Sequence, residues 1–344
     1  MASTAKTLTF VIPAYNMESY LDRCVNSLLS ASDISDLEVL IVDDGSKDGT
    51  LEYARKLERT NPGAVRAIHQ ENKGHGGAVN TGIAAATGMY VKVVDADDWV
   101  DPQAIDTVLA TLRAQHDTDE PIDMLVTNYV YDKVAKRHKT VVNFRRVMEA
   151  GRVLGWDDLG KFGLAQYIIM HALTFRTQVV RDSGLKLPEH TFYVDNLFVY
   201  EPLPYVKTIY YLNVDFYRYY IGREGQSVNE QIMIKRLDQQ LRVNYRMIDA
   251  YDLWSIEEKH LREYMLSYLE TITVVSTCLA YVSGTKENLH KAKALWKYIR
   301  DKDYRTYHHL RWGVLGGAMN LPGRFGRYLS VKAYRISQRF MGFN

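Results

Sequence analysis

Residues 38–50 read EVLIVDDGSKDGT, an apolar run that ends in two aspartates and a glycine and leads into a segment with helical spacing. Apolar runs and helically spaced segments also alternate on both sides of it, at 7–12, 19–29, 50–58, 65–69, 78–86 and 90–94. Continuous apolar strands that alternate with helices are typical of a mostly parallel sheet covered by helices on both faces. We therefore predict an α/β fold with a doubly wound sheet.

The pattern changes twice along the chain. From about residue 121 strand-like runs mix with aromatic loops, and from residue 229 to about 301 three helical segments follow. The sequence therefore predicts an α/β domain with two halves, then a helical region and a tail, with bounds at 1–120, 121–228, 229–303 and 304–344.

Composition excludes several classes of protein. The 344 residues are 47% hydrophobic and 24% charged, which is ordinary for a globular chain and unlike disordered, collagen-like or coiled-coil sequences. The two cysteines, Cys24 and Cys278, exclude a disulfide framework and a cysteine-rich zinc site, and they fit a reducing compartment. The most apolar stretch, 266–282, is interrupted by Glu270, so we expect no membrane span. The first residues are interpreted as a strand rather than a signal peptide.

The tail concentrates positive charge. Residues 304–344 hold seven Lys or Arg and no Asp or Glu, whereas the whole chain has a net charge of only +2. On a helical wheel over 323–342, one arc is apolar and its neighbour is basic. The apolar arc holds Phe325, Leu329, Ala333, Ile336 and Phe340; the basic arc holds Arg324, Arg327, Lys332, Arg335 and Arg339. This pattern fits an anionic membrane surface, and its alternative is a helix docked on the protein. We do not expect nucleic-acid binding, because no base-stacking motif accompanies the basic arc.

Three polar clusters follow three predicted strands. In Asp95-Ala96-Asp97-Asp98, alternate acids on extended backbone point the same way, so Asp95 and Asp97 can converge on one magnesium or manganese ion. The alternative is a solvated turn. Asp43 and Asp44 can accept hydrogen bonds from a ribose or a base, or belong to a turn. The glycine-rich residues 72–82, NKGHGGAVNTG, can bring backbone N–H groups to an anion, or form a tight strand–helix turn.

Taken together, VIPAYN at 11–16, VDDGSKDGT at 42–50, NKGHGGAVNTG at 72–82 and DADD at 95–98 resemble the N-terminal half of family 2 glycosyltransferases with the GT-A fold. The resemblance covers residues 7 to about 105 and implies a Rossmann-like catalytic domain that binds a nucleotide-diphosphate sugar, usually UDP-linked. It implies that Tyr15 contacts the uracil, Asp44 the base or ribose, Asp95 the ribose or metal, and that Asp97 is the metal ligand. The implied donor site also includes Pro13, Ala14, Lys73, Gly74 and Ala96.

The second half resembles the family at two places. HTFYVDNLF at 190–198 looks like the acidic segment that holds the catalytic base, and Asp195 is the matching acid; its alternative role is a helix N-cap. Arg223 lies in a loop resembling the one that closes over the diphosphate, and it can equally be a surface arginine. Trp99 can stack on a sugar and His171 can hydrogen-bond a hydroxyl, although both also suit core packing.

The resemblance implies a metal-dependent, inverting transfer of a sugar from a UDP-sugar to a hydroxyl of a cell-surface glycan or its lipid-linked precursor. Asp95 and Asp97 would hold the manganese or magnesium ion, and Asp195 would take the acceptor proton. We expect a bacterial polysaccharide enzyme in the cytoplasm, held peripherally at the membrane by its tail, with the helices available for a homo-oligomer. The alternatives are a catalytically inactive scaffold for other transferases and a sugar nucleotidyltransferase, which would place a basic glycine-rich loop after the first strand.

Overall fold

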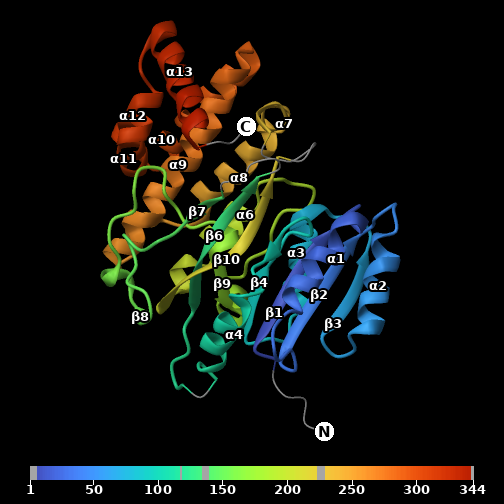
Figure 1. Cartoon of the computed structure of the whole chain (residues 1–344). Helices are drawn as coiled ribbons and strands as arrows, with labels where there is room; N and C mark the ends of the chain where they lie inside the picture. The colour runs from blue at the N-terminus through green and yellow to red at the C-terminus, as the bar shows by residue number, and fades with distance from the viewer. Residues whose placement is uncertain (1–5, 117, 134–138, 223–228, 342–344) are drawn as a thin grey trace. The chain divides into compact units, whose positions relative to one another are not determined.

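A computed structural model describes residues 6–116, 118–133, 139–222 and 229–341 of the chain. It divides into two compact units: Met1–Gly160 with Ile168–Ile221, and Lys161–Tyr167 with Gly222–Asn344. The first unit holds every described strand, and the second is helical apart from its loops (Figure 1). The predicted helical region and tail thus share one unit.

The α/β unit is built on one ten-stranded sheet in the order β3-β2-β1-β4-β9-β6-β10-β5, with β7 beside β6 and β8 beside β10. Its strands are β1 (Leu8–Ala14), β2 (Leu37–Asp44), β3 (Val65–Gln70), β4 (Tyr90–Val93), β5 (Trp99–Val100), β6 (Met124–Lys133), β7 (Thr140–Val142), β8 (Val153–Leu154), β9 (Leu173–Arg176) and β10 (Ile209–Ile221). Strands β3, β2, β1 and β4 are parallel. The predicted α/β class with a mostly parallel sheet is confirmed.

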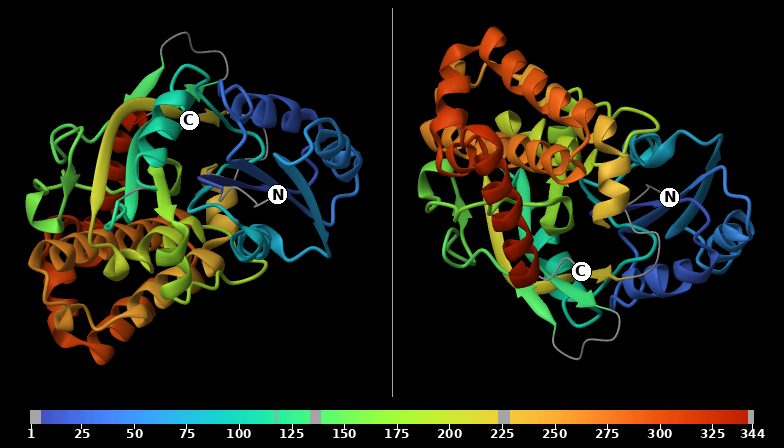
Figure 2. Two further views of the ribbon diagram at one scale, coloured as in Figure 1. Left: turned by 90° about the horizontal axis from the view of Figure 1, so that it is seen from below. Right: turned by 90° about the horizontal axis from the view of Figure 1, so that it is seen from above.

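Helices cover both faces of the parallel half. They are α1 (Glu18–Leu28), α2 (Thr50–Thr60) and α3 (Gly74–Ala85), with α1 and α3 on opposite faces (Figure 2). Because both faces are covered, every residue of β1 and β2 is buried. In α1 the buried apolar residues fall at helical spacing and form its inner face: Leu21, Cys24, Val25 and Leu28.

Four strands, β5, β7, β8 and β9, run antiparallel to their neighbours, and β9 is the one that lies within the sheet between parallel strands. Strand β9 runs antiparallel between β4 and β6, and its pairing with β4 ends after Tyr90 and Val91. Helix α4 (Ile105–Arg113), α5 (Thr177–Asp182) and α6 (Asp195–Tyr200) complete the unit. Helix α3 starts four residues earlier than predicted, because the glycines at its start belong to its first turn.

The helical unit contains α7 (Glu230–Lys235), α8 (Leu237–Ala250), α9 (Lys259–Ser283), α10 (Lys286–Lys302), α11 (Tyr304–Trp312), α12 (Val314–Met319) and α13 (Gly323–Met341). Its core helix is α9, which contacts α8, α10, α11, α12 and α13. By length and composition α9 is apolar enough to cross a membrane, and 78% of its most apolar window is buried inside the structure. That burial is what a core helix of this unit requires.

Candidate active site

The loops after β1 and β2 are tied together at one edge of the sheet. Asn16, which has a positive φ of 55°, accepts from the Lys47 backbone N–H at 2.8 Å, and its own N–H donates to Ser46 Oγ at 3.0 Å. Just before it, Pro13 and Ala14 are buried in β1, whereas Tyr15 is 42% exposed. These two hydrogen bonds hold the loops together, and the Tyr15 ring stays accessible above the strand ends. The family resemblance implies that this ring contacts the base.

The two aspartates at the end of β2 have different partners. Asp43 is fully buried, and its Oδ2 lies 2.7 Å from His69 Nδ1. Asp44 Oδ1 accepts from Gln70 Nε2 at 2.7 Å and from the Lys73 backbone N–H at 2.8 Å. Asp44 thus fixes the start of the glycine-rich segment, and its predicted contact to base or ribose stays a prediction.

The glycines at the start of α3 let two segments approach closely. Gly74 has a φ of 74°, and a Cβ built on it would lie 2.9 Å from the His190 backbone. The His190 N–H donates to the Lys73 carbonyl at 2.8 Å, and a Cβ on Gly76 would lie 2.6 Å from the Pro188 carbonyl oxygen. Glycine is therefore needed at positions 74 and 76 so that the backbone of residues 188–190 can pack against the start of α3. The sequence analysis did not predict this packing role.

A side chain at Gly74 should accordingly be costly. We expect Gly74→Ala to lower the free energy of unfolding by about 2–4 kcal/mol, because it adds a backbone clash to the cost of a positive φ. Gly63 is the matched control: its φ is 81° and nothing lies within 4 Å of its Cβ position. Gly63→Ala should cost only about 1 kcal/mol. Urea unfolding of both variants measures the difference, and equal costs would contradict the packing role.

An acidic cluster follows β4. Asp95 Oδ1 lies 2.8 Å from His75 Nε2. Asp98 is 1% exposed; its Oδ2 accepts from the Tyr217 hydroxyl at 2.6 Å and its Oδ1 from the Tyr220 N–H at 2.8 Å. Burial, with Asp97 and Asp95 nearby, raises the pKa of Asp98 well above its usual value. Burial alone would lower the pKa of His75, but the bond to Asp95 and the surrounding carboxylates raise it overall.

His171 completes this cluster from the turn before β9. Its Nε2 lies 3.7 Å from Asp95 Oδ2 and 3.6 Å from Asp98 Oδ2, and its ring packs on Tyr219 at 4.2 Å between centroids. Both ring nitrogens are buried without a hydrogen-bond partner in the described part of the chain. Burial lowers the pKa of His171 to about 4, so the ring is neutral at pH 7.

These residues fit a divalent cation. One ligand atom each from Asp95, Asp98 and His171 lies within 4.8 Å of the others. Two carboxylates and a neutral imidazole form a mixed oxygen and nitrogen set that suits manganese, and a cation would give the orphaned imidazole a partner. Asp98 already accepts two hydrogen bonds, from Tyr217 and Tyr220, and these hold its carboxylate in a fixed position within the cluster. The sequence analysis predicted Asp95 as a ligand and assigned His171 to a sugar or acceptor hydroxyl; it did not predict that His171 lies beside Asp95 and Asp98.

The remaining predicted residues near this cluster are placed as follows. Asp97 is half-buried, and its backbone carbonyl accepts from the Arg23 guanidinium at 2.9 Å. That guanidinium also covers the Trp99 ring at 3.8 Å, so one face of Trp99 is engaged in packing. Ala96 is buried within the turn. Arg223 lies outside the described residues.

Asp195 begins α6, on the segment that packs against Gly74. Val194 occupies the N-cap, so Asp195 is a first-turn residue rather than the cap. The segment is strained, because His190 and Tyr193 have φ values of 49° and 67°. Burial raises the pKa of Asp195 to about 6, partly offset by the positive charge of His75. Asp195 is thus held close enough to His75 and Asp95 for their charges to act on it.

A buried lysine, Lys92 on β4, was missed by the sequence analysis. It is fully buried, and its Nζ donates to the carbonyls of His171 at 2.8 Å and Leu173 at 2.9 Å. Lys92 therefore replaces the strand pairing that is lost where β4 and β9 part. Burial lowers the pKa of Lys92 to about 7. The signal was available, since a lysine interrupts the otherwise apolar run YVKVV at 90–94.

Removing the Lys92 amine should leave the backbone that carries His171 less firmly held. We expect Lys92→Met to weaken manganese binding about tenfold or more, because two buried carbonyls lose their donor and the backbone carrying His171 shifts. Thr174→Val is the matched control, since Thr174 is buried on the same strand pair and its hydroxyl has no partner in the described chain. Manganese titration followed by electron paramagnetic resonance measures both variants. Unchanged manganese affinity in a folded Lys92→Met protein would show that Lys92 does not position the site.

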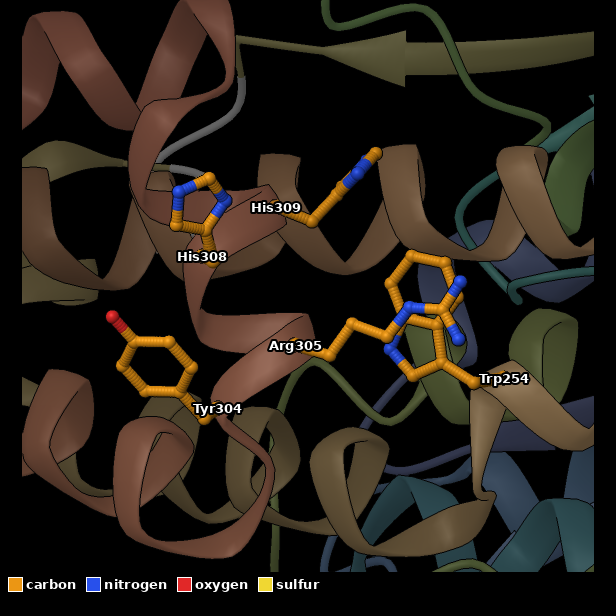
Figure 3. Close-up of a pocket in the computed structure, with 5 residues that line it drawn as sticks. All are labelled: Trp254, Tyr304, Arg305, His308 and His309. Atoms are coloured by element: carbon orange, nitrogen blue, oxygen red, sulfur yellow. The ribbon is translucent and has the colours of Figure 1, made fainter.

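The helical unit has a pocket of its own. It is about 410 Å³ in volume, and Trp254, Tyr304, Arg305, His308 and His309 line it (Figure 3). The Arg305 guanidinium lies 3.7 Å above the Trp254 ring, and Trp254 Nε1 donates to Thr306 Oγ1 at 2.9 Å. None of the residues predicted for catalysis lines this pocket. Its arginine, Arg305, already stacks on the indole ring of Trp254.

Comparison with known proteins identifies a family that matches the first part of the α/β unit. Residues 9–149 match the family described as Glycosyl transferase family 2. This part of the chain, residues 9–149, belongs to glycosyltransferase family 2. The match spans β1 to β7 and includes Asp95, Asp97 and Asp98, whereas His171 and Asp195 lie beyond it.

Relatives within glycosyltransferase family 2 cover different shares of the chain. Chondroitin synthase of Escherichia coli is 42% identical over 106 residues, which are 31% of this chain and 15% of that protein. The uncharacterized glycosyltransferase YibD of Escherichia coli strain K12 is 28% identical over 260 residues, 71% of this chain and 74% of YibD. The chain thus spans only a small part of the chondroitin synthase.

Solved structures share the fold across both units. TarS residues 1–349 from S. aureus, in complex with UDP-GlcNAc, has a TM-score of 0.68 at 20% identity and covers 96% of this chain and 92% of its own. A mannosyltransferase from Pyrobaculum calidifontis, in complex with GDP-Man and Mn2+, has a TM-score of 0.56 at 16% identity. At these identities the likeness establishes the GT-A fold.

Proposed function

We propose that the protein transfers a sugar from a UDP-sugar to a hydroxyl group with inversion at the anomeric carbon. The observation that carries this proposal is the cluster of Asp95, Asp98 and His171, with His75 and Asp195 in electrostatic reach of it. A group that binds a diphosphate and a partly buried carboxylate that takes a proton are the two requirements of such a transfer.

Each residue has a defined task in this proposal. Asp95 and His171 of the observed cluster, together with Asp97 as the family resemblance implies, would hold a divalent cation, which would supply a Lewis acid for the departing diphosphate. Asp98, fixed by Tyr217 and Tyr220, braces these ligands. Tyr15 and Asp44 bind the nucleoside, with Arg223 on the diphosphate as the family resemblance implies.

Asp195 takes the proton of the acceptor hydroxyl. Its raised pKa of about 6 leaves it ionised at pH 7 yet basic enough to accept that proton. A single carboxylate base with direct displacement produces inversion. Residues 188–190, seated on Gly74, fix the start of the segment that carries this base.

The acceptor is proposed by class. Chondroitin synthase and hyaluronan synthase are among the relatives, so a hydroxyl of a bacterial surface polysaccharide or of its lipid-linked precursor is the acceptor that we propose. Such an enzyme would work at the cytoplasmic face of the membrane. UDP is preferred as the carrier because TarS, which has the highest TM-score of the structures compared above, was solved with UDP-GlcNAc.

Calorimetric titration tests the proposal. We expect UDP and one UDP-sugar to bind only with manganese or magnesium present, and we expect water to hydrolyse that UDP-sugar slowly, releasing UDP, when no acceptor is added. GDP-mannose is the comparison ligand, since the mannosyltransferase of the same fold was solved with it. If GDP-mannose is the only ligand that binds in a metal-dependent way, the donor is a GDP-sugar and not a UDP-sugar. Binding of a nucleotide-sugar without any turnover would favour the inactive scaffold.

A further inference from the structure

The end of the helical unit exposes an unusual amount of apolar surface. Fourteen large apolar side chains are exposed in the described part of the chain, and seven of them lie between residues 304 and 329. Six of these follow one another from the end of α11 to α13: Trp312, Val314, Leu321, Phe325, Tyr328 and Leu329. Trp312 is 66% exposed and Phe325 is 72% exposed. Large apolar groups gathered on a surface mark a contact site.

Two small residues of helix α13, Gly326 and Ser330, are buried, whereas three of its large apolar residues in the described part of the chain are exposed. A Cβ on Gly326 would lie 2.3 Å from the Leu321 carbonyl oxygen, so only glycine allows this approach. Ser330 is buried, and its hydroxyl donates to the Ala318 carbonyl at 3.1 Å. Phe325 and Leu329 flank these residues in the sequence yet remain exposed. The helix is therefore docked through Gly326 and Ser330, and two residues of the apolar arc predicted from the sequence, Phe325 and Leu329, are exposed.

The charges that residues 304–344 contribute to this surface are all positive, while the nearby Glu270 of α9 is buried and accepts a hydrogen bond from the Gly316 N–H at 2.9 Å. Residues 304–344 contain no Asp or Glu. The Arg311 guanidinium lies 4.6 Å from the centre of the Trp312 ring, and Lys332 Nζ lies 6.0 Å from that of Tyr328. Aromatic rings beside cations suit the boundary between lipid headgroups and acyl chains, where the ring enters and the cation stays with the phosphates.

We propose that this surface, defined by the six apolar residues above with Arg311, Arg327, Lys332 and Arg335, binds an anionic lipid bilayer in the plane of its headgroups. The apolar groups supply insertion and the cations supply attraction to anionic lipid. The long apolar helix α9 does not serve as the anchor, because most of it is buried in the unit. The proposal does not depend on the glycosyl-transfer chemistry.

Vesicle flotation of the full chain tests it. We expect the protein to float with phosphatidylcholine vesicles that contain roughly 30% phosphatidylglycerol and to stay at the bottom with phosphatidylcholine alone, since the cations need anionic lipid. High salt should release it. The double variant Trp312→Ser/Phe325→Ser should lower the floated fraction at least about tenfold. The triple variant Arg327→Gln/Lys332→Gln/Arg335→Gln should lose the dependence on phosphatidylglycerol.

The matched control is Leu164→Ser, which removes a leucine that is also 66% exposed and lies in the same unit. It should float like the unchanged protein. Equal flotation of the double variant, or no flotation of the unchanged protein, would overturn the proposal. So would a dimer in solution that the double variant converts to a monomer while neither binds vesicles, because a second copy would then cover this surface.

Discussion

The variant Asp195→Asn is expected to reduce sugar transfer about 10³-fold while leaving the affinity for a UDP-sugar within about twofold, because an amide cannot take the acceptor proton. Asn keeps the size and polarity of the side chain, so the strained turn at Tyr193 should be retained. Initial rates with saturating donor, together with donor titration by calorimetry, measure the two effects separately.

The pH profile gives the same residue a second signature. Burial raises the pKa of Asp195 to about 6, and only its ionised form can act as a base. The value of kcat/KM should therefore fall about tenfold per pH unit below pH 6, a limb that Asp195→Asn should lack. Asp182→Asn removes an exposed carboxylate from the same unit and should change neither the rate nor the profile. A comparable rate in Asp195→Asn and unchanged protein would remove Asp195 as the base.

The variant Asp95→Asn is expected to weaken metal-dependent UDP binding at least about 100-fold, because Asp95 is shared by the predicted metal pair and by the observed cluster. His75 would also lose its carboxylate partner at 2.8 Å. Calorimetry with and without manganese measures the loss, and the melting temperature checks that the protein is folded.

Two further substitutions assign the other ligands. His171→Ala and Asp97→Asn should each weaken manganese binding about tenfold, if both side chains join Asp95 as proposed. If only Asp97→Asn weakens manganese binding, the ligands are Asp95 and Asp97, as the sequence analysis predicted. If only His171→Ala weakens manganese binding, Asp97 is not a ligand. UDP binding by Asp95→Asn that still requires manganese with undiminished affinity would contradict the site as a whole.

The sequence predicted the parallel half of the sheet because each of its strands is buried on both faces and therefore apolar throughout, as in β1 and β2. It also predicted that Asp44 and Asp95 lie at the same edge of the sheet, because the carboxyl ends of the parallel strands meet at that edge. The antiparallel β9 could not be predicted, because strand direction depends on a long connection that leaves no local pattern.

The site was only half visible in the sequence for a similar reason. Asp95 and Asp97 form a short motif, whereas His171 joins them from a turn 74 residues after Asp97. Nothing near a lone histidine reports that its ring nitrogens are buried without partners. Lys92 was visible as a charge within an apolar strand, but its two carbonyl acceptors belong to a distant segment.

The contact of Gly74 and Gly76 with residues 188–190 bears on how this enzyme could be redesigned. At Gly74 and Gly76 the segment that would hold the donor and the segment that carries Asp195 approach each other so closely that a Cβ at either glycine would clash with backbone atoms. A library aimed at new sugar donors would therefore lose most of its folded members if it included these two glycines. Variation is better directed at the loops after β1 and β2, where Tyr15 is exposed and the backbone of Asp195 is not disturbed.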